Sequence, residues 1–270
     1  ETPSLGGARA DEEEAIDNYG GGQMSVIRSY MQTAHQLLER LEKTQTAAIE
    51  TAAGAVAAAM SNKCAIHCAS LGHGIAGDFI NRAGGLAAVL AFSHKFEISD
   101  PVPAALKQRP NDQPVDRELE AVRLAVRAGN LRRGDVMLVG SVSGRTSGQI
   151  ELALACRERG LTVIAFTSIE YASQAPSLHP SGKSLGEAAT VVIDLCVPYG
   201  DAGVDVPGLE IKAIPLSGLA TLVAGWMLWG RVMERMAAAG NPPTVFMSVN
   251  REGGKAYYDK AMEQFNARGY

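Results

Sequence analysis

The sequence lacks an apolar run long enough to cross a lipid bilayer. Its most apolar stretch, residues 216–230, is about 15 residues long, whereas a spanning helix needs about 20. Residues 1–23 are rich in Gly, Asp and Glu and have no apolar core of the kind that secretory signals carry. These absences predict a cytoplasmic protein without a membrane partner. Residues 1–24 are expected to be an upstream extension or an expression remnant, with Met24 as an internal start.

Cysteine is scarce and offers no disulfide framework. The four cysteines lie within apolar patterns, as is typical of a reducing cytosol, at Cys64, Cys68, Cys156 and Cys196. If Cys64 and Cys68 share a strand, about 13 Å separates them, too far for one metal ion. No other cluster has the spacing of metal ligands, so no metal site is expected.

Basic tracts are also missing. The net charge is −4, which disfavours nucleic acid as a partner. Apolar residues make up 46% of the chain and charged residues 20%, as in ordinary globular proteins. A chain of 270 residues is long enough for one large α/β domain, alone or with an extension.

Short apolar strands alternate with helical patterns through most of the chain. This alternation predicts a parallel sheet covered by helices on both faces. The expected strands span residues 63–69, 87–92, 136–139, 161–166, 191–196 and 245–249. The expected helices span residues 25–61 (with a second, alanine-rich helix beginning at Thr44), the stretch from the turn after the first strand to Ala83, and residues 117–128, 147–159, 216–239 and 257–266.

The segment of residues 93–114 is irregular, rich in proline and too long for a simple connection, which predicts a flap or a subunit contact. His94 lies in it without an assigned role. On the helix that follows, Glu118 and Glu120 are interpreted as a solvated face. The alanine-rich helix and the apolar helix 216–239 offer more apolar surface than one sheet covers, so we expect a homo-oligomer, a dimer or a tetramer.

The pattern around which the chain is organised is a strand, a polar turn and a helix at residues 135–147. The strand breaks at Gly140, and the first N–H groups of the following helix have no intrahelical partner, so they favour an anion. The turn adds hydroxyls, a flexible backbone position and a positive charge: Ser141, Ser143, Gly144, Arg145, Thr146 and Ser147. One hydroxyl would be explained by helix capping alone. Several in seven residues predict a phosphate-binding loop.

A dinucleotide cofactor is an alternative use of such a sheet. Residues 72–77 match the pattern Gly-x-Gly-x-x-Gly after a strand. The acidic residue that confirms such a site about 20 positions further on is missing, because Phe92 and Ser93 stand near that place. In a chain with 29 glycines the match is weak, and no cofactor is expected.

The spacing Ser141-x-Ser143-Gly144-x-Thr146 resembles the phosphate loop of sugar isomerase (SIS) domains. Further similarities follow in order along the chain at residues 82–85, 165–171, 181–183 and 197–202, and the likeness covers residues 25–254. The resemblance implies an α/β fold with a doubly wound parallel sheet, a flavodoxin-like three-layer sandwich of SIS type. The expected organisation is an N-terminal helical arm (25–61), the SIS domain (62–254) and a C-terminal helix (255–270).

The resemblance also implies a phosphorylated sugar as the ligand and a carboxylate with a histidine as the catalysts. Asp78 best matches the place of the carboxylate, although relatives of this branch tend to have glutamate there. His179 is the candidate for opening the sugar ring, and His73 lies in a turn where ligands of open sheets bind. The implied catalytic set is Asp78, His73, His179 and Lys183. The implied phosphate ligands are Ser70, Ser141, Ser143, Gly144, Arg145, Thr146, Ser147 and Ser168.

Three functions remain open at this point. The first is an aldose–ketose isomerase that moves a proton between adjacent carbons through an enediolate. The second is an etherase or epimerase that uses the same chemistry. The third is a non-catalytic, regulatory module that binds a phosphorylated sugar, although no helix-turn-helix domain is attached.

Overall fold

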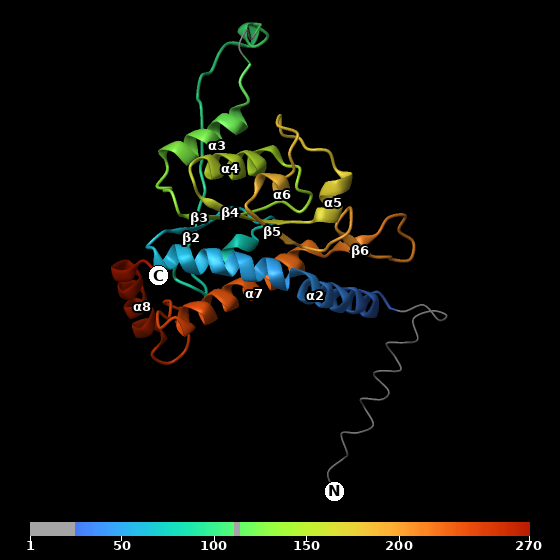
Figure 1. The fold of residues 1–270 in the computed structure, drawn as a ribbon. Helices are drawn as coiled ribbons and strands as arrows, with labels where there is room; N and C mark the ends of the chain where they lie inside the picture. The colour runs from blue at the N-terminus through green and yellow to red at the C-terminus, as the bar shows by residue number, and fades with distance from the viewer. Residues whose placement is uncertain (1–24, 111–113) are drawn as a thin grey trace.

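The computed structural model describes residues 25–110 and 114–270, so the interpretation of residues 1–24 as an extension falls outside the described part. A five-stranded sheet in the order β2-β1-β3-β4-β5 forms the middle layer (Figure 1). All its neighbouring strands pair in parallel, which confirms the predicted fold class. The strands are β1 (Ile66–Cys68), β2 (Val89–Ala91), β3 (Val136–Gly140), β4 (Thr162–Thr167) and β5 (Val191–Asp194), with a separate hairpin of β6 (Ala202–Val204) and β7 (Ala213–Pro215).

Helices cover both faces of this sheet, as the alternation of strands and helices predicts (Figure 1). The elements are α2 (Val26–Ser61), α3 (Arg117–Ala128), α4 (Ser147–Glu158), α5 (Ile169–Gln174), α6 (Leu185–Ala188), α7 (Ser217–Ala238) and α8 (Gly254–Arg268), with 3₁₀ turns η1 (Ile75–Asp78) and η2 (Ala104–Leu106). Successive side chains of β3 point to opposite faces. Leu138 packs in the core with α2 and α7, whereas Met137 and Val139 pack in the core with α3 and α4.

The strand order places a switch of direction between β1 and β3. From β1 the chain crosses to β2 on one side, and it then returns to lay β3 on the other side of β1. The two connections leave the carboxyl edge of the sheet in opposite directions, which opens a crevice there. Val136 and Leu138 of β3 lie beside Ile66 and Cys68 of β1, and β3 continues to Gly140 at the same edge of the sheet. The fold therefore predicts a ligand site at this edge.

The N-terminal arm is one continuous helix of 36 residues, not the two helices expected from the sequence. Ser25 caps its start by accepting the N–H of Arg28. Its alanine-rich half packs against α7, and Ala52 and Ala53 are fully buried. Small side chains at these positions let the two helices approach closely. In the part of the chain that the structure describes, no helix has the length and apolarity of a membrane span.

The sequence predicts a helix from the turn after β1 to Ala83, and this prediction is wrong. Only the single 3₁₀ turn η1 forms there. His73 (φ 43°), Gly74 (φ 77°) and Asn81 (φ 52°) adopt left-handed backbone conformations. A right-handed helix cannot contain such residues, because each reverses the sense of the chain. The glycines that suggest a nucleotide loop therefore serve a compact turn.

The predicted strand at residues 245–249 is also wrong. The segment makes only an isolated antiparallel bridge between Leu86 and Val245, next to the start of edge strand β2. At the other edge of the sheet, Gln45 of α2 accepts the N–H of Asp194 in β5 through its Oε1 (2.9 Å). The backbone at both edges thus has partners from outside the sheet.

Strand β1 carries a buried histidine beside a buried carboxylate. His67 Nε2 lies 3.6 Å from Asp135 Oδ2. The Asp135 carboxylate also accepts the N–H groups of Ala65 (2.8 Å) and Arg132 (2.7 Å). Burial lowers the pKa of His67 below its ordinary value of 6.5, and the Asp135 charge offsets only part of this effect. His67 is therefore held neutral in the folded chain.

We expect the free energy of unfolding to decrease as the pH falls below about 6.5, since the unfolded chain then binds a proton that folded His67 takes up only at lower pH. A His67→Gln variant should lose less stability than the parent between about pH 7 and about pH 5. Urea unfolding at the two pH values measures this difference, with the exposed His35 replaced by Gln as the control. An equal pH dependence in the parent and in His67→Gln would contradict the assignment.

Candidate active site

The loop between β3 and α4 folds into a tight turn that leaves polar groups unused. The Gly144 N–H donates to the Ser141 carbonyl oxygen (3.0 Å), and the hydroxyl oxygens of Ser141 and Thr146 lie 3.1 Å apart. Thr146 is the N-cap residue of α4, yet its side chain makes no capping hydrogen bond. The N–H groups in the first turn of α4 therefore remain available to a ligand.

Three peptide groups of this loop have a fixed orientation, because their carbonyl oxygens accept N–H groups from residues 168–185. The bonds run from Ser168 to Val142 (2.9 Å), from Leu185 to Gly144 (2.7 Å) and from Leu178 to Arg145 (3.0 Å). In a trans peptide the N–H points opposite to the C=O, and the described peptide bonds are all trans. The N–H groups of Ser143, Arg145 and Thr146 therefore point away from residues 168–185.

These three N–H groups have no acceptor within residues 25–110 and 114–270. Successive N–H groups that share one side of a loop form an anion-binding concavity. The Ser143 and Ser147 hydroxyls likewise make no hydrogen bond to the described part of the chain, and Arg145 Nε is buried without a partner. A bound anion would supply acceptors to all of these donors.

Gly144 is required for this arrangement. Its φ is 66°, in the left-handed region that favours glycine. A Cβ at this position would lie 2.9 Å from Thr167 Oγ1 and 3.1 Å from Ala172 Cβ. The loop is therefore pressed against β4 and α5, and no side chain fits between them.

A cavity of about 450 Å³ opens beside the first turn of α4. It lies at the carboxyl ends of β1, β2 and β3, at the switch of strand direction where open α/β sheets bind ligands. Its walls are mainly apolar and include Leu71, Phe92 and Leu152. The polar side chains that line it are Ser70, Ser93, His94, Glu118 and Gln149.

Two of these side chains lack the partners that a buried or charged group needs. Gln149 Oε1 is buried without a hydrogen bond, which costs about 1–3 kcal/mol unless a ligand donates to it. The Glu118 carboxylate lies directly against Gly148 in the first turn of α4, where the helix dipole favours negative charge. Neither Glu118 nor His94 makes a side-chain hydrogen bond to the described part of the chain.

Sequence reasoning missed Glu118, Gln149 and His94. Glu118 is exposed, as predicted, but its side chain also lines the cavity, because α3 packs on α4. His94 is exposed and reaches the cavity because it directly follows the end of β2. The only sequence signal for His94 was its place just after a strand, and Glu118 had none, because its location depends on the packing of two helices.

Asp78 and His73 do not line this cavity. Asp78 Oδ1 forms an ion pair with Arg82 Nη1 (2.8 Å). His73 is exposed in its turn, whereas the neighbouring Gly74 and Ala76 do line the cavity. Asp78 and His73 therefore lie near the carboxyl edge of the sheet, as predicted, but neither side chain lines the cavity beside α4.

His179 has a different environment from the one expected. It is only 7% exposed, with Nε2 2.7 Å from Glu151 Oε2 and Nδ1 2.8 Å from Ser181 Oγ. Both ring nitrogens are thus hydrogen-bonded inside the protein, and the ring does not line the cavity beside α4. The arrangement gives no support to ring opening by His179.

The other predicted site residues, Ser70, Ser168 and Lys183, lie in three different environments. Ser70 lines the cavity beside α4. Ser168 is fully buried: its hydroxyl donates to the Val197 carbonyl oxygen (2.6 Å) and accepts the Tyr171 N–H (3.1 Å). Ser168 is therefore the N-cap of α5 and has no free donor for phosphate. Lys183 is exposed and makes no ion pair within the described residues.

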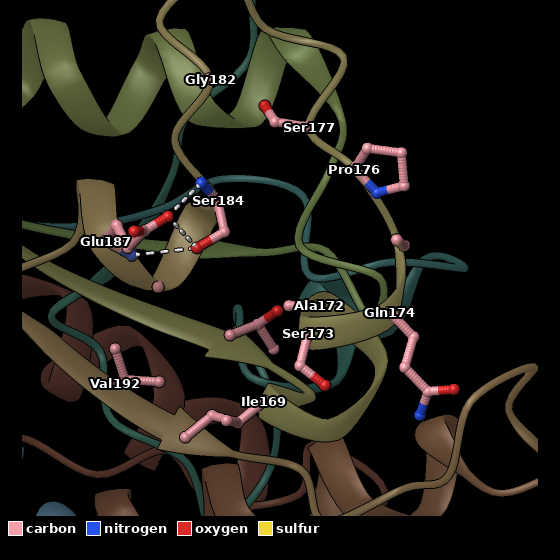
Figure 2. A pocket seen from close by; sticks show the side chains of 13 residues that line it. Ile169, Ala172, Ser173, Gln174, Pro176, Ser177, Gly182, Ser184, Glu187 and Val192 are labelled. Carbon is pink, nitrogen blue, oxygen red and sulfur yellow. Dashed lines mark hydrogen bonds between the residues drawn. The ribbon is translucent and has the colours of Figure 1, made fainter.

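A larger cavity of about 630 Å³ lies between α5, α6 and the segment that joins them (Figure 2). Most of its polar side chains already have hydrogen-bond partners within the protein. Glu187 accepts both the N–H (2.7 Å) and the hydroxyl (2.8 Å) of Ser184, and the Ser177 hydroxyl donates to the Lys183 carbonyl oxygen (2.7 Å). This cavity consequently offers fewer free groups to a polar ligand than the one beside α4.

No group of three or more His, Cys, Asp or Glu side chains that could hold a metal ion occurs in residues 25–110 and 114–270. The four cysteines are free thiols. Burial raises the pKa of Cys68 and of Cys156 to about 12, so both thiols stay protonated at neutral pH.

Comparison with known proteins finds a matching family model and relatives that are similar over most of the chain. The family model described as SIS domain matches residues 29–168. A UPF0309 protein from Caldanaerobacter subterraneus subsp. tengcongensis is 32% identical over 249 residues, which cover 90% of this chain and 98% of the relative. A UPF0309 protein from Halalkalibacterium halodurans is 31% identical and covers 89% and 98% of the two chains.

Solved structures with a similar architecture include a phosphoheptose isomerase from Francisella tularensis, with 15% identity, a TM-score of 0.46, and coverage of 77% of this chain and 96% of that one. The sugar isomerase domain of an RpiR transcription factor from Sphaerobacter thermophilus has 14% identity, a TM-score of 0.46, and coverage of 89% and 97%. At these values neither structure specifies an activity for this chain.

Proposed function

Because the chain belongs to the SIS domain family, we propose that it binds a phosphorylated sugar, with the phosphate on the loop between β3 and α4. The observation that carries this proposal is the row of fixed, unpartnered N–H groups at Ser143, Arg145 and Thr146. The uncapped start of α4 and the unpaired Arg145 guanidinium add favourable charge for an anion.

The cavity beside α4 is the place that we assign to the sugar. Its volume of about 450 Å³ lies in the range of small-molecule sites. Gln149 Oε1 needs a hydrogen-bond donor, and a sugar hydroxyl is one. A sugar that displaces water from between the apolar walls would strengthen the electrostatic interactions inside the cavity.

For the reaction we propose an aldose–ketose isomerisation. Glu118 removes the proton from the hydroxyl-bearing carbon next to the carbonyl group, and the electrons of that C–H bond form the C=C bond of an enediolate while the carbonyl oxygen takes the negative charge. The proton of the neighbouring hydroxyl moves to that oxygen, and Glu118 returns its proton to the former carbonyl carbon, so the new carbonyl forms where the hydroxyl was. His94, at the same cavity, serves as the acid and base that open the sugar ring. This assignment replaces Asp78, which is paired with Arg82, and His179, which is bonded to Glu151.

Two other activities use the same cavity. An etherase or an epimerase begins with the same proton removal, so it also depends on Glu118, and only analysis of the products separates it from an isomerase. A regulatory module needs the phosphate loop but not Glu118. The unpartnered carboxylate over the cavity favours an enzyme.

Sugar phosphates are expected to raise the melting temperature, since a ligand that binds only the folded chain stabilises it by about 2.7 kcal/mol at a hundred times its dissociation constant. Differential scanning fluorimetry with a panel of phosphorylated sugars measures this, with the unphosphorylated sugars as matched controls. Products of any stabilising sugar are then identified by NMR. If neither inorganic phosphate nor any sugar phosphate shifts the transition, the proposal is wrong.

We also propose that the protein is a homo-oligomer of the cytoplasm. Residues 93–110 and 114–116 extend away from the sheet (Figure 1), and Phe96, Ile98 and Val115 in these segments are each more than half exposed, which is unfavourable in water. A second copy would cover them. A monomeric mass by light scattering at micromolar concentration would contradict this assembly.

A further inference from the structure

The segment that joins α5 to α6 holds the phosphate loop in shape. We call residues 175–185, which end in the first residue of α6, the brace. Its Leu178 N–H binds the Arg145 carbonyl oxygen (3.0 Å), and its Leu185 N–H binds the Gly144 carbonyl oxygen (2.7 Å). These two bonds set the directions of the Arg145 and Thr146 N–H groups. The geometry of the anion site therefore depends on a segment that has no regular secondary structure over most of its length (Figure 2).

One side chain anchors the brace to the body of the protein. His179 follows Leu178 directly, is 7% exposed, and places Nε2 2.7 Å from Glu151 Oε2 on α4. The Ser181 N–H lies 3.1 Å from His179 Nδ1 and donates to it, so Nε2 carries the hydrogen and donates to Glu151. The ring thus links the brace to the same helix whose first turn begins at the phosphate loop.

Glu151 is itself fixed. Arg123 of α3 binds it through Nε (2.6 Å) and Nη2 (3.3 Å), a fork geometry that holds a carboxylate in one orientation. Burial acts to raise the pKa of Glu151, but the hydrogen bonds from Arg123 and His179 outweigh burial and keep the pKa below its ordinary value. Glu151 therefore remains an ionised acceptor at neutral pH. Charge-assisted hydrogen bonds of this kind are stronger than neutral ones.

We infer that His179 is a positioning residue for phosphate binding: through Glu151 it fixes the brace, and through the brace it fixes the N–H groups that bind the anion. The inference rests on the proposed function of the β3–α4 loop. It gives His179 a role in the site without contact with the sugar. It also accounts for the buried pair of His179 and Glu151, with its partner Arg123, that the proposed chemistry does not otherwise use.

The test compares two replacements of the same residue. His179→Leu removes the donor to Glu151, whereas Gln places an amide N–H close to the position of Nε2. We expect His179→Leu to weaken binding of inorganic phosphate and of a stabilising sugar phosphate about tenfold or more, the scale of one hydrogen bond to a charged group. His179→Gln should stay within about threefold of the parent. Isothermal titration calorimetry gives both dissociation constants.

Two controls separate positioning from general loss of stability. Leu228→Ala removes a fully buried side chain of α7 in the opposite layer, so it should lower the melting temperature without changing phosphate affinity. Hydrogen exchange of the Leu178 and Leu185 amides should become faster in His179→Leu. If His179→Leu does not fold, Glu151→Gln serves instead, because a neutral amide binds His179 and Arg123 more weakly and should lower phosphate affinity in the same direction.

The outcomes are distinct. If the parent protein binds neither inorganic phosphate nor a sugar phosphate, the proposed function of the loop is wrong. If the parent binds and His179→Leu binds equally well, only the positioning role is overturned. Equal losses in His179→Leu and His179→Gln would also overturn it, because the donor to Glu151 would then not be what matters. A loss in His179→Leu that Gln restores supports the inference.

Discussion

Glu118→Gln is expected to reduce turnover of the sugar phosphate by about a hundredfold or more while leaving its dissociation constant nearly unchanged. Glutamine keeps the size of the side chain over Gly148 but cannot accept a proton from carbon. The Glu118 side chain makes no hydrogen bond to the described part of the chain, so little of the fold is lost with its charge. Steady-state kinetics on the sugar that stabilises the protein, with calorimetry for binding, measures both quantities.

Asp78→Asn is the matched comparison for this prediction. Asp78 is the carboxylate that the family resemblance favours, but its partner is Arg82 and it does not line the cavity beside α4. We expect Asp78→Asn to turn over substrate within a few-fold of the parent. If Asp78→Asn loses activity and Glu118→Gln retains it, the base is Asp78 and not Glu118. Equal turnover in all three proteins would mean that neither carboxylate is the base, whereas sugar phosphate binding without turnover in any of them would favour a regulatory binding module.

Gly144→Ala should weaken phosphate binding about tenfold or more, because a left-handed backbone costs other residues about 1–2 kcal/mol and the new Cβ also meets neighbours. The methyl group would lie 2.9 Å from Thr167 Oγ1 and 3.1 Å from Ala172 Cβ. To avoid them the loop must move, and the Gly144 carbonyl then leaves its bond to Leu185. Calorimetry with inorganic phosphate reports the loss.

Gly200→Ala provides the control for the backbone cost alone. Gly200 also has a positive φ (85°), but a Cβ there would meet nothing within 4 Å. This variant should lose some stability and keep its phosphate affinity. If both variants bind phosphate as the parent does, the loop between β3 and α4 does not hold the phosphate.

The sheet and the polar turn between β3 and α4 could be predicted from the sequence because their signals are local. Five of the six expected strands form, and the turn after β3 has its polar residues and its glycine within a short span. The positions that sequence reasoning missed depend on tertiary packing. Glu118 meets the first turn of α4 only because α3 lies across it, and nothing near Glu118 in sequence indicates that neighbour.

The errors also have physical causes. The glycines after β1 match a nucleotide pattern, but left-handed residues at His73 and Asn81 end the helix that the pattern requires. The sequence indicates a role for His179, yet its burial beside Glu151 cannot be predicted from its place in a polar loop. A residue type indicates chemistry, whereas its role depends on the partners that the fold supplies.

The covered edges of the sheet restrict how copies of this protein can associate. Exposed edge strands pair readily with strands of other molecules and are a common route to aggregation. Here the backbone of residues 244–246 is hydrogen-bonded to residues 84–87, just before β2. At the other edge, the Asp194 N–H of β5 donates to the Gln45 side chain. A second copy therefore cannot simply extend the sheet at these positions. Any assembly of copies would therefore rely on the side chains of the helical layers and of residues 93–110 and 114–116, where contacts select a partner by shape.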